Sequence, residues 1–308
     1  MNRFIRYWNQ NRKKIIMTIA IIAFIFLLIR ALNYIAKISK EEDESIKVVD
    51  TSKPIQSVIT GEEVSEEITD KNLQIVQQFI DACNERKYEI AYALLTEECK
   101  ENVYNNDINL FIKNYCEDIF QTKKTYEIDL WLNSGKIYTY KVKYYEDNLL
   151  ATGGSQMNKN TEDYITISGE KLNINGFITK REINKSVKEN DINIIINSRL
   201  IYKNYETYDI TINNYSSKSI MLSNGQDSND ICLIDENKTE YASIIYELST
   251  SDLILQAGYQ KNMKIRFNKV YDIYRIIDKV KFSNIIDEEQ YNIKPEISVE
   301  TMNITIDI

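Results

Sequence analysis

The longest run of hydrophobic positions lies near the N-terminus. Residues 15–29 are apolar except for Thr18, and after Arg30 the run continues to Ala36. The whole stretch has about 22 residues, which is enough to cross roughly 30 Å of hydrocarbon as a helix. We therefore expect one N-terminal transmembrane helix over residues 15–36. The predicted helix begins at Ile15, passes through Ile22 and Ile29, and ends at Ala36.

The flanks of this stretch carry opposite charges. Arg12, Lys13 and Lys14 directly precede it, whereas residues 41–44 are all acidic. The positive-inside bias predicts a cytosolic tail over residues 1–14 and places everything after the helix outside the membrane. A cleaved signal peptide is the alternative, but its apolar core would run about 7 to 15 residues and end at a small-residue cleavage site. The chain has a longer run and no such site after it, so we expect an uncleaved anchor.

Beyond the anchor the pattern changes twice before residue 183. Residues 37–70 are polar and acidic without a sustained apolar period, which predicts a solvated stalk. From Asp70 to Ile119 apolar residues recur at i, i+3, i+4 and i+7, which predicts three amphipathic helices. The period then falls to two, which predicts antiparallel strands wrapped around these helices. The predicted strands are residues 126–132, 138–144, 164–167 and 172–178.

The remainder of the chain has a strand pattern throughout. A polar stretch at residues 184–190 separates it from the preceding region, and short β-branched runs recur from Asp191 to Ile308 between loops rich in Asn, Ser and Asp. About seven strands with one apolar face predict an antiparallel β-sandwich. We therefore expect two globular domains, at residues 71–183 and 184–308.

Two segments resemble known families. Residues 76–115 read VQQFIDACNERKYEIAYALLTEECKENVYNNDINLFIKNY, and this order of helices resembles the nuclear-transport-factor-two-like (cystatin-like) superfamily. The resemblance covers residues 71–183 and implies a cone with a mouth that can hold a small ligand. Some bacterial members follow one membrane anchor and serve as extracytoplasmic parts of secretion and conjugation machines. Residues 196–223 (INSRLIYKNYETYDITINNYSSKSIMLS) are similar to immunoglobulin-like modules of Gram-positive membrane-anchored proteins. Neither family brings catalytic residues to this chain.

The expected fold class is therefore α+β, with three helices packed on a curved antiparallel sheet, plus an all-β immunoglobulin-like sandwich and one N-terminal transmembrane helix.

Charge and composition narrow the chemistry. The chain has 308 residues with 38 basic and 46 acidic side chains, and the first 40 residues hold eight of the basic ones and no acid. The remainder has a net charge of −16 and would repel phosphate backbones, so we expect no nucleic-acid partner. The chain contains no histidine, which removes Ser/His/Asp and Cys/His catalysis and imidazole metal ligands. The four cysteines lack C-x-x-C spacing, so they predict buried apolar thiols, with a Cys99–Cys116 or Cys83–Cys116 disulfide as the alternative.

Candidate pocket residues remain in the strands of the first domain. An Asp base and a Tyr oxyanion donor can move a proton beside a carbonyl without histidine. The candidates are Asp129, Tyr138, Tyr140 and Tyr164. Tyrosines that alternate along a strand also simply fill a half-buried face. We therefore expect no catalytic site, metal or cofactor, although calcium at the Asp-rich loop DSNDICLIDENK and sugar at Trp131 or Tyr144 stay open.

The favoured function is a membrane-anchored, extracytoplasmic binding or assembly protein in the envelope of a Gram-positive bacterium. It would contact membrane lipid through its N-terminal helix and an envelope protein through its outer domains, as a component of a secretion, conjugation or wall-associated complex. The alternative is a small-ligand sensor or an Asp/Tyr proton-transfer enzyme that uses the cone pocket of the α+β domain.

Overall fold

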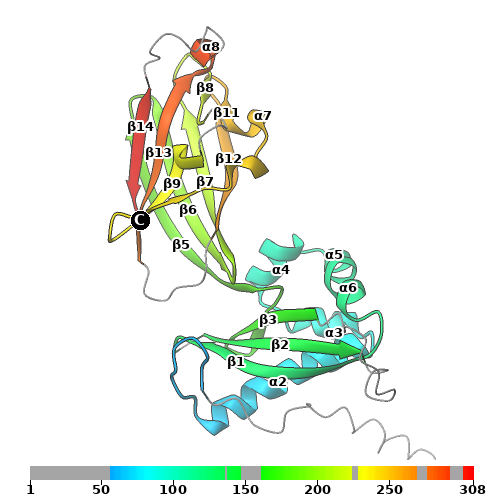
Figure 1. Cartoon of the computed structure of the whole chain (residues 1–308). Helices are drawn as coiled ribbons and strands as arrows, with labels where there is room; N and C mark the ends of the chain where they lie inside the picture. The colour runs from blue at the N-terminus through cyan, green and yellow to red at the C-terminus, as the bar shows by residue number, and fades with distance from the viewer. Residues whose placement is uncertain (1–55, 136, 147–160, 224–227, 269–275, 292–300) are drawn as a thin grey trace, which may run out of the picture. The chain divides into compact units, whose positions relative to one another are not determined.

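The fold was obtained as a computed structural model, shown in Figure 1. It describes residues 56–135, 137–146, 161–223, 228–268, 276–291 and 301–308. The predicted cytosolic tail, the helix at residues 15–36 and most of the stalk lie outside these residues. The chain divides into a unit of residues 1–49 and a unit of residues 50–308, and only the second is described below. Within it, the described helices are all too short or too polar to span a membrane.

The end of the predicted stalk is folded, which corrects that prediction. The amides of Val58 and Ile59 donate to the carbonyls of Leu130 and Trp131, each at 3.0 Å. Helix α2 (Glu66–Asn84) begins before Asp70. Its N-cap Ser65 accepts from an amide of the first turn, and this satisfies a donor that has no partner within the helix.

The helices of the first region are short apart from α2, which has 19 residues. The predicted apolar face of α2, at Val76, Phe79, Ile80 and Cys83, is fully buried. The helices that follow are α3 (Tyr88–Ala93), α4 (Glu97–Tyr104), α5 (Ile108–Phe111), a π-helical turn (Ile112–Cys116) and α6 (Glu117–Ile119).

A four-stranded antiparallel sheet follows these helices, in the order β1-β2-β3-β4. Its strands are β1 (Lys124–Asn133), β2 (Tyr138–Glu146), β3 (Thr161–Ser168) and β4 (Lys171–Asn173). The predicted turn at residues 168–171 joins β3 and β4. A second turn, at Asn175 and Gly176 with φ values of 58° and 69°, then leads into β5.

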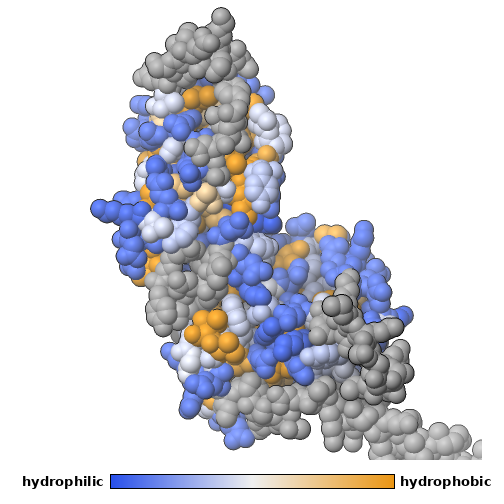
Figure 2. Space-filling model, viewed as in Figure 1, coloured by the Kyte–Doolittle hydropathy of each residue, from blue (hydrophilic) through white to orange (hydrophobic). Residues whose placement is uncertain are grey.

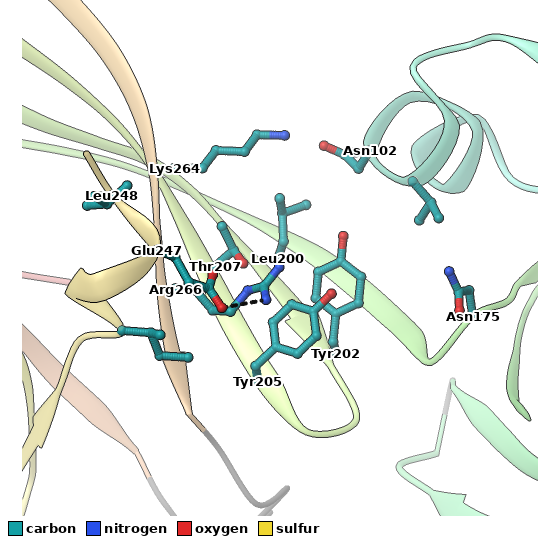
Figure 3. A pocket seen from close by; sticks show the side chains of 12 residues that line it. Asn102, Asn175, Leu200, Tyr202, Tyr205, Thr207, Glu247, Leu248, Lys264 and Arg266 are labelled. Atoms are coloured by element: carbon teal, nitrogen blue, oxygen red, sulfur yellow. Dashed lines mark hydrogen bonds and ion pairs between the residues drawn. The ribbon is translucent and has the colours of Figure 1, made fainter. Parts of the chain in front are cut away.

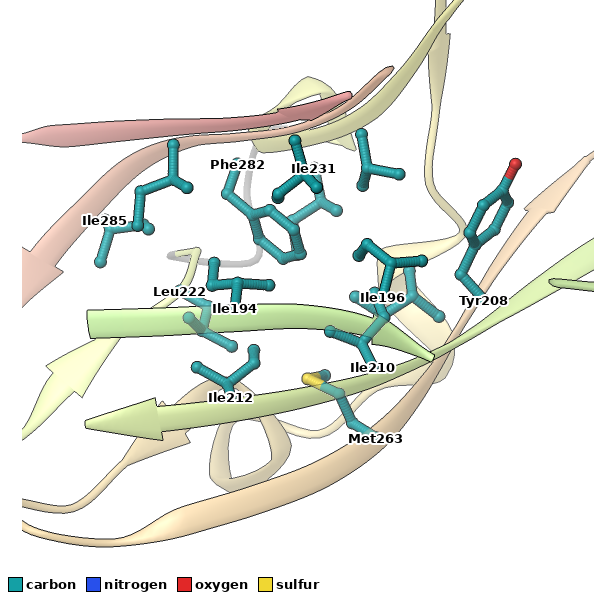
Figure 4. Close-up of a cluster of buried hydrophobic side chains, with 14 of the residues drawn as sticks. Ile194, Ile196, Tyr208, Ile210, Ile212, Leu222, Ile231, Met263, Phe282 and Ile285 are labelled. Carbon is teal, nitrogen blue, oxygen red and sulfur yellow. The ribbon is translucent and has the colours of Figure 1, made fainter. Parts of the chain in front are cut away.

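Two further antiparallel sheets face each other across one hydrophobic core (Figure 4). The first has the order β12-β7-β6-β5, and the second β10-β9-β13-β8-β11 with β14 paired to β13. The strands of the first are β5 (Phe177–Glu189), β6 (Ile192–Tyr202), β7 (Tyr205–Asn214) and β12 (Gln260–Asn268). Those of the second are β8 (Ile220–Met221), β9 (Ile231–Asp235), β10 (Glu240–Ala242), β11 (Ile254–Leu255), β13 (Ile277–Asp287) and β14 (Met302–Asp307). The small helices are α7 (Thr250–Leu253) and α8 (Glu288–Tyr291), with 3-10 turns at Ser228–Asp230 and Ile245–Glu247.

The core forms because hydrophobic and polar residues alternate along its strands. Ile194, Ile196, Ile210 and Ile212 occupy every second position of β6 and β7 and are fully buried, and Phe282 faces them from the opposite sheet (Figure 4). Each buried side chain of this size removes enough apolar surface from water to contribute about 1.5 to 3 kcal/mol.

The predicted fold class is wrong. The described chain is predominantly β, with three antiparallel sheets, and no described residue belongs to a transmembrane helix. The α+β prediction overestimates the helices because residues 108–119 have an amphipathic period but break into three short pieces. The linker predicted before the immunoglobulin-like sandwich is also wrong, because residues 184–189 continue strand β5 along β6. The polar composition of residues 184–189 predicted a linker, but a strand that is largely exposed on both faces is equally polar.

Candidate functional site

The predicted pocket residues do not share one site. In the antiparallel register Tyr140 lies opposite Leu130 and Ile165, whereas Lys141 lies opposite Asp129 and Tyr164. Residues that lie opposite each other share a face, and successive residues alternate between faces. Tyr140 is therefore on one side of the sheet, and Asp129 and Tyr164 are on the other.

Each of these four residues has a structural explanation. Tyr138 donates to the carbonyl of Gly135 at 3.2 Å, and buried Tyr140 accepts from the Asn72 amide at 3.1 Å. The Asp129 side chain is 45% exposed, and its carboxylate lies 3.5 Å from the ammonium of Lys143. Tyr164 packs edge-on against Trp131. The structure does not bring the predicted acid and tyrosines together as a proton-transfer pair.

The helix-facing side of the first sheet is filled by aromatic rings. Tyr115 stacks on Phe111 with ring centroids 5.8 Å apart and lies at the same distance from Phe79. Its hydroxyl lies 3.3 Å from the hydroxyl of Tyr144, and all four side chains are buried. The interior that the cone-pocket alternative requires is thus occupied by protein in the described part of the chain.

A buried carboxylate, Asp163, stands at the edge of this aromatic cluster. It accepts four hydrogen bonds, two on each oxygen. Oδ2 accepts from the Tyr115 hydroxyl at 2.7 Å and the Asn175 amide at 3.1 Å. Oδ1 accepts from the amides of Tyr164 at 2.6 Å and Gly176 at 3.0 Å. Burial raises the pKa of Asp163, and the four donors oppose this by favouring the ionised form. Because both oxygens are committed to fixed donors, Asp163 holds the 175–176 turn and does not act as a free base.

The turn held by Asp163 supports the tip of the β6–β7 hairpin. The Gly176 carbonyl accepts from the Lys203 amide at 2.9 Å, and the Lys203 ammonium lies 3.6 Å from the centre of the Tyr164 ring. Within the hairpin, the rings of Tyr202 and Tyr205 stack with centroids 4.4 Å apart. The hairpin tip is therefore fixed both to the turn and within itself.

Cationic and aromatic groups continue this stack on both sides. The Arg266 guanidinium lies 4.2 Å from the Tyr205 ring centre, a distance at which cation–π attraction operates. Arg266 also pairs with Glu247 at 3.1 Å. On the opposite side, Phe177 packs against Tyr202 with centroids 5.1 Å apart. Burial raises the pKa of both tyrosines, so their hydroxyls stay protonated at neutral pH.

A cavity of about 350 Å³ lies beside this hairpin (Figure 3). This volume is within the range of small-molecule sites in proteins. Most of its lining is polar and comes from α4, the 175–176 turn, β6, β7 and β12. The lining residues are Asn102, Val103, Asn175, Leu200, Tyr202, Tyr205, Thr207, Ile244, Glu247, Leu248, Lys264 and Arg266.

Three polar groups point into this cavity. In Figure 3 the Lys264 ammonium, the Asn102 side chain and the Tyr202 hydroxyl lie around the same space. The Asn102 amide nitrogen donates to the Glu98 carbonyl at 2.9 Å, which leaves its oxygen for the cavity. Among the described residues Lys264 has no ion-pair partner and the Tyr202 hydroxyl has no hydrogen-bond partner. The cavity therefore presents unused donors, and its one acid, Glu247, is already paired.

Two other hollows are less developed as sites. One, of about 260 Å³, lies beside Lys203 and shares Asn175, Tyr202 and Tyr205 with the first. The other, of about 700 Å³, lies around the β11–β12 connection, where Lys261 already donates to the carbonyl of Ser251 at 2.7 Å. In the hollow beside Lys203 the ammonium already lies against the Tyr164 ring, whereas in the cavity of Figure 3 the Lys264 ammonium has no such contact with a described ring.

Of the aspartates in the loop considered for calcium, Asp227 lies outside the described residues, and Asp230 and Asp235 are used internally. Asp230 accepts from the Ser223 hydroxyl and the Asn284 amide, each at 2.8 Å. Asp235 accepts from the amides of Asn237 and Thr239, as a turn residue does. In the described ranges no three acidic or thiol side chains are grouped as a metal site requires. The four cysteines are buried and free, as predicted.

The residues that form this cavity were not predicted. Asp163, which holds the turn beside the cavity and does not line it, did carry a signal: it occupies the same face of β3 as Ile165 and Ile167 and is thus an acid at a core position. No comparable signal marks Tyr202 or Lys264, since their positions in the pattern match those of ordinary surface residues.

Comparison with known proteins adds little. No family model matches the chain, and no curated protein does. A crystal structure of a conserved hypothetical protein from Bacillus anthracis is 14% identical, with a TM-score of 0.25. The match covers 37% of this chain and 93% of that one, and it is too slight to bear on fold or function.

Proposed function

We propose that this chain is a non-enzymatic binding protein of the bacterial cell envelope. In this proposal the apolar stretch at residues 15–36 holds it at the membrane with its N-terminus in the cytosol, and the described unit lies outside. The observation that carries the binding role is the polar cavity beside the β6–β7 hairpin, with its preorganised tyrosine stack and unpaired Lys264.

The geometry supports binding better than proton transfer. A general base needs a lone pair directed at the substrate. Asp163 directs both oxygens at backbone amides and the Tyr115 hydroxyl, and Glu247 is paired with Arg266. The tyrosines keep their protons because burial raises their pKa. What remains in the cavity is the Lys264 ammonium, the Tyr202 hydroxyl and the Asn102 oxygen, a combination suited to holding a ligand.

The surface also favours a small polar contact site. On the face shown in Figure 2, hydrophilic residues cover most of the described surface and the hydrophobic residues form separate patches. A stable complex that relied on a large apolar face would require a more continuous patch there. Restriction to the membrane plane would raise the effective concentration of partners, so that modest contacts suffice for assembly.

The test is site-specific photo-crosslinking of the full-length chain in native membranes. A photoreactive residue replaces Asn204, which is exposed at the hairpin tip, and in a control chain it replaces Lys238, which is exposed in the β9–β10 turn. We expect one envelope component to be captured from position 204 and not from position 238. Capture should decrease when Tyr202 is also changed to Phe.

Two results would contradict the proposal. Recovery of the chain alone from both positions would remove the envelope-binding role. A C-terminal tag that impermeant reagents reach only after cell lysis would remove the extracytoplasmic location.

A further inference from the structure

The geometry of the cavity points to a ligand class: we infer that it binds a small molecule, or the end of a larger one, that presents a carboxylate or phosphate oxyanion next to a hydroxyl group. This inference rests on the proposed binding function and specifies the ligand of the same cavity.

The oxyanion is assigned from the donors. Lys264 is exposed on β12 and forms no ion pair with any described residue, and Figure 3 shows its ammonium directed into the cavity. The Tyr202 hydroxyl points toward the same space. An ammonium and a phenol that line one cavity can both donate to an anionic oxygen, and the bond from the ammonium is charge-assisted. The ammonium of Lys264 can only donate, so it does not suit a cationic ligand, whereas the Tyr202 hydroxyl can donate to an anionic oxygen.

The local charge agrees with this assignment. Arg266 and Lys264 contribute two positive charges to the lining and Glu247 contributes one negative charge. Because Glu247 is paired with Arg266, the charge that a ligand meets is that of Lys264. Asp209 lies opposite Lys264 in the β7–β12 register but is not part of the lining. The cavity is thus a positive site on an acidic body, which would select one anionic group and repel a long polyanion.

The neighbouring hydroxyl is assigned from the acceptor. The Asn102 nitrogen is used by the Glu98 carbonyl, so its oxygen is the group that remains for a ligand. This side chain lines the same cavity as Lys264 (Figure 3). A ligand hydroxyl beside the anionic group would donate to that oxygen.

The tyrosine stack argues against a neutral sugar as the main ligand. Sugar rings bind on open aromatic faces, but the faces in this stack are occupied. Tyr205 is covered by Arg266 on one side and by Tyr202 on the other, and Tyr202 also packs against Phe177. The stack therefore presents hydroxyl edges to the cavity, and recognition would depend on hydrogen bonds.

The experiment measures binding by titration calorimetry on the full-length chain in lipid nanodiscs. The probes are inorganic phosphate, D-glucuronate and neutral D-glucose. We expect saturable binding of phosphate or D-glucuronate, whichever source the site is built for, and weaker binding of D-glucose. K264M should weaken the preferred anion by about tenfold to a hundredfold, the value of one charge-assisted hydrogen bond. Y202F keeps the ring stack but removes the hydroxyl, so it should weaken binding of the preferred anion several-fold.

The control variant is K185M, which removes an equal charge from an exposed position on β5. Equal effects of K264M and K185M would overturn the inference, as would D-glucose binding as tightly as D-glucuronate or an absence of anion binding. These failures are separate from failure of the proposed function. A partner captured at position 204 without anion binding removes the ligand class alone, and anion binding with the chain recovered alone removes only the envelope-assembly role.

Discussion

The most informative single substitution is Asp163→Asn, which keeps the shape of the side chain and removes one acceptor oxygen. An asparagine can retain Oδ1 for the amides of Tyr164 and Gly176. Its NH₂ group then faces the Asn175 amide, which lies 3.1 Å from Oδ2 in the wild type, and two donors cannot bond each other. The Tyr115 hydroxyl can rotate and accept instead.

The expected cost follows from that one lost bond. An amide left without a partner in a buried place costs about 1 to 3 kcal/mol in the free energy of unfolding. The loss should be local as well as global, because the 175–176 turn is held mainly by this carboxylate. We therefore expect urea denaturation of D163N to show a lower midpoint, and the amides of Asn175 and Gly176 to exchange hydrogen faster than those of β2.

The matched control is Asp129→Asn, on the other face of the same sheet. Asp129 is 45% exposed with a 3.5 Å ion pair, so its loss should cost less than about 0.5 kcal/mol. If D163N were as stable as the wild type and exchanged at the same rates, the reasoning would be refuted. That result would mean that Asp163 is held as a neutral acid and that the turn does not depend on its charge.

Three further predictions concern other parts of the described unit. Arg199 pairs with fully buried Glu206 beside the hairpin tip, so R199M should lower the free energy of unfolding by about 3 to 5 kcal/mol. The double variant R199M/E206Q should lower it less, because it leaves no unpaired buried charge. Equal losses for the two variants in urea denaturation would contradict this. All four cysteines are buried, so mass spectrometry should find no alkylation by iodoacetamide at pH 8 in the folded chain and four modified thiols in denaturant. Rapid labelling of the folded chain would contradict this prediction. The bond from Lys218 lowers the pKa of Asp287, so its stabilising contribution is present above the unfolded pKa of about 3.9 and is lost as pH falls through the folded value. The thermal midpoints of D287N and the wild type should therefore differ at pH 7 and converge as the pH falls below the lowered pKa of Asp287. A difference that stays constant with pH would count against the pair.

The parts of the fold that were predictable are those that local periodicity determines. The buried face of α2 follows the spacing of Val76, Phe79, Ile80 and Cys83, and the alternation in β6 and β7 follows from their isoleucines. Helix length was not predictable in the same way, because an amphipathic period does not state where the hydrogen-bonded ladder breaks. The break near residue 112 is a π-helical turn in which Tyr115 is buried against Phe111.

Strand continuity was the second limit. Residues 184–189 are mostly exposed on both faces, and an exposed strand has the composition of a linker. Only the pairing with β6 distinguishes the two, and polar composition does not indicate that pairing even though the partner strand follows directly in the sequence. The cavity was hidden for a different reason, since Asn102 and Lys264 are distant in the sequence and line one cavity only in the folded chain. Asp163 was the exception, because the sequence alone shows an acid at a position of β3 where the alternating pattern predicts a buried residue.

Asp163 also explains why the filled interior and the open cavity belong to one arrangement. The carboxylate accepts from Tyr115, which belongs to the aromatic cluster, and from the 175–176 turn, whose Asn175 lines the cavity. The Gly176 carbonyl in turn holds Lys203 at the hairpin tip. Asp163 is the acid buried beside the tyrosines of the first sheet. Two of the amides that bond to it belong to the 175–176 turn, and this turn accepts a hydrogen bond from the hairpin. The wall of the cavity at Asn175 is therefore preorganised by polar atoms that are themselves fully hydrogen-bonded.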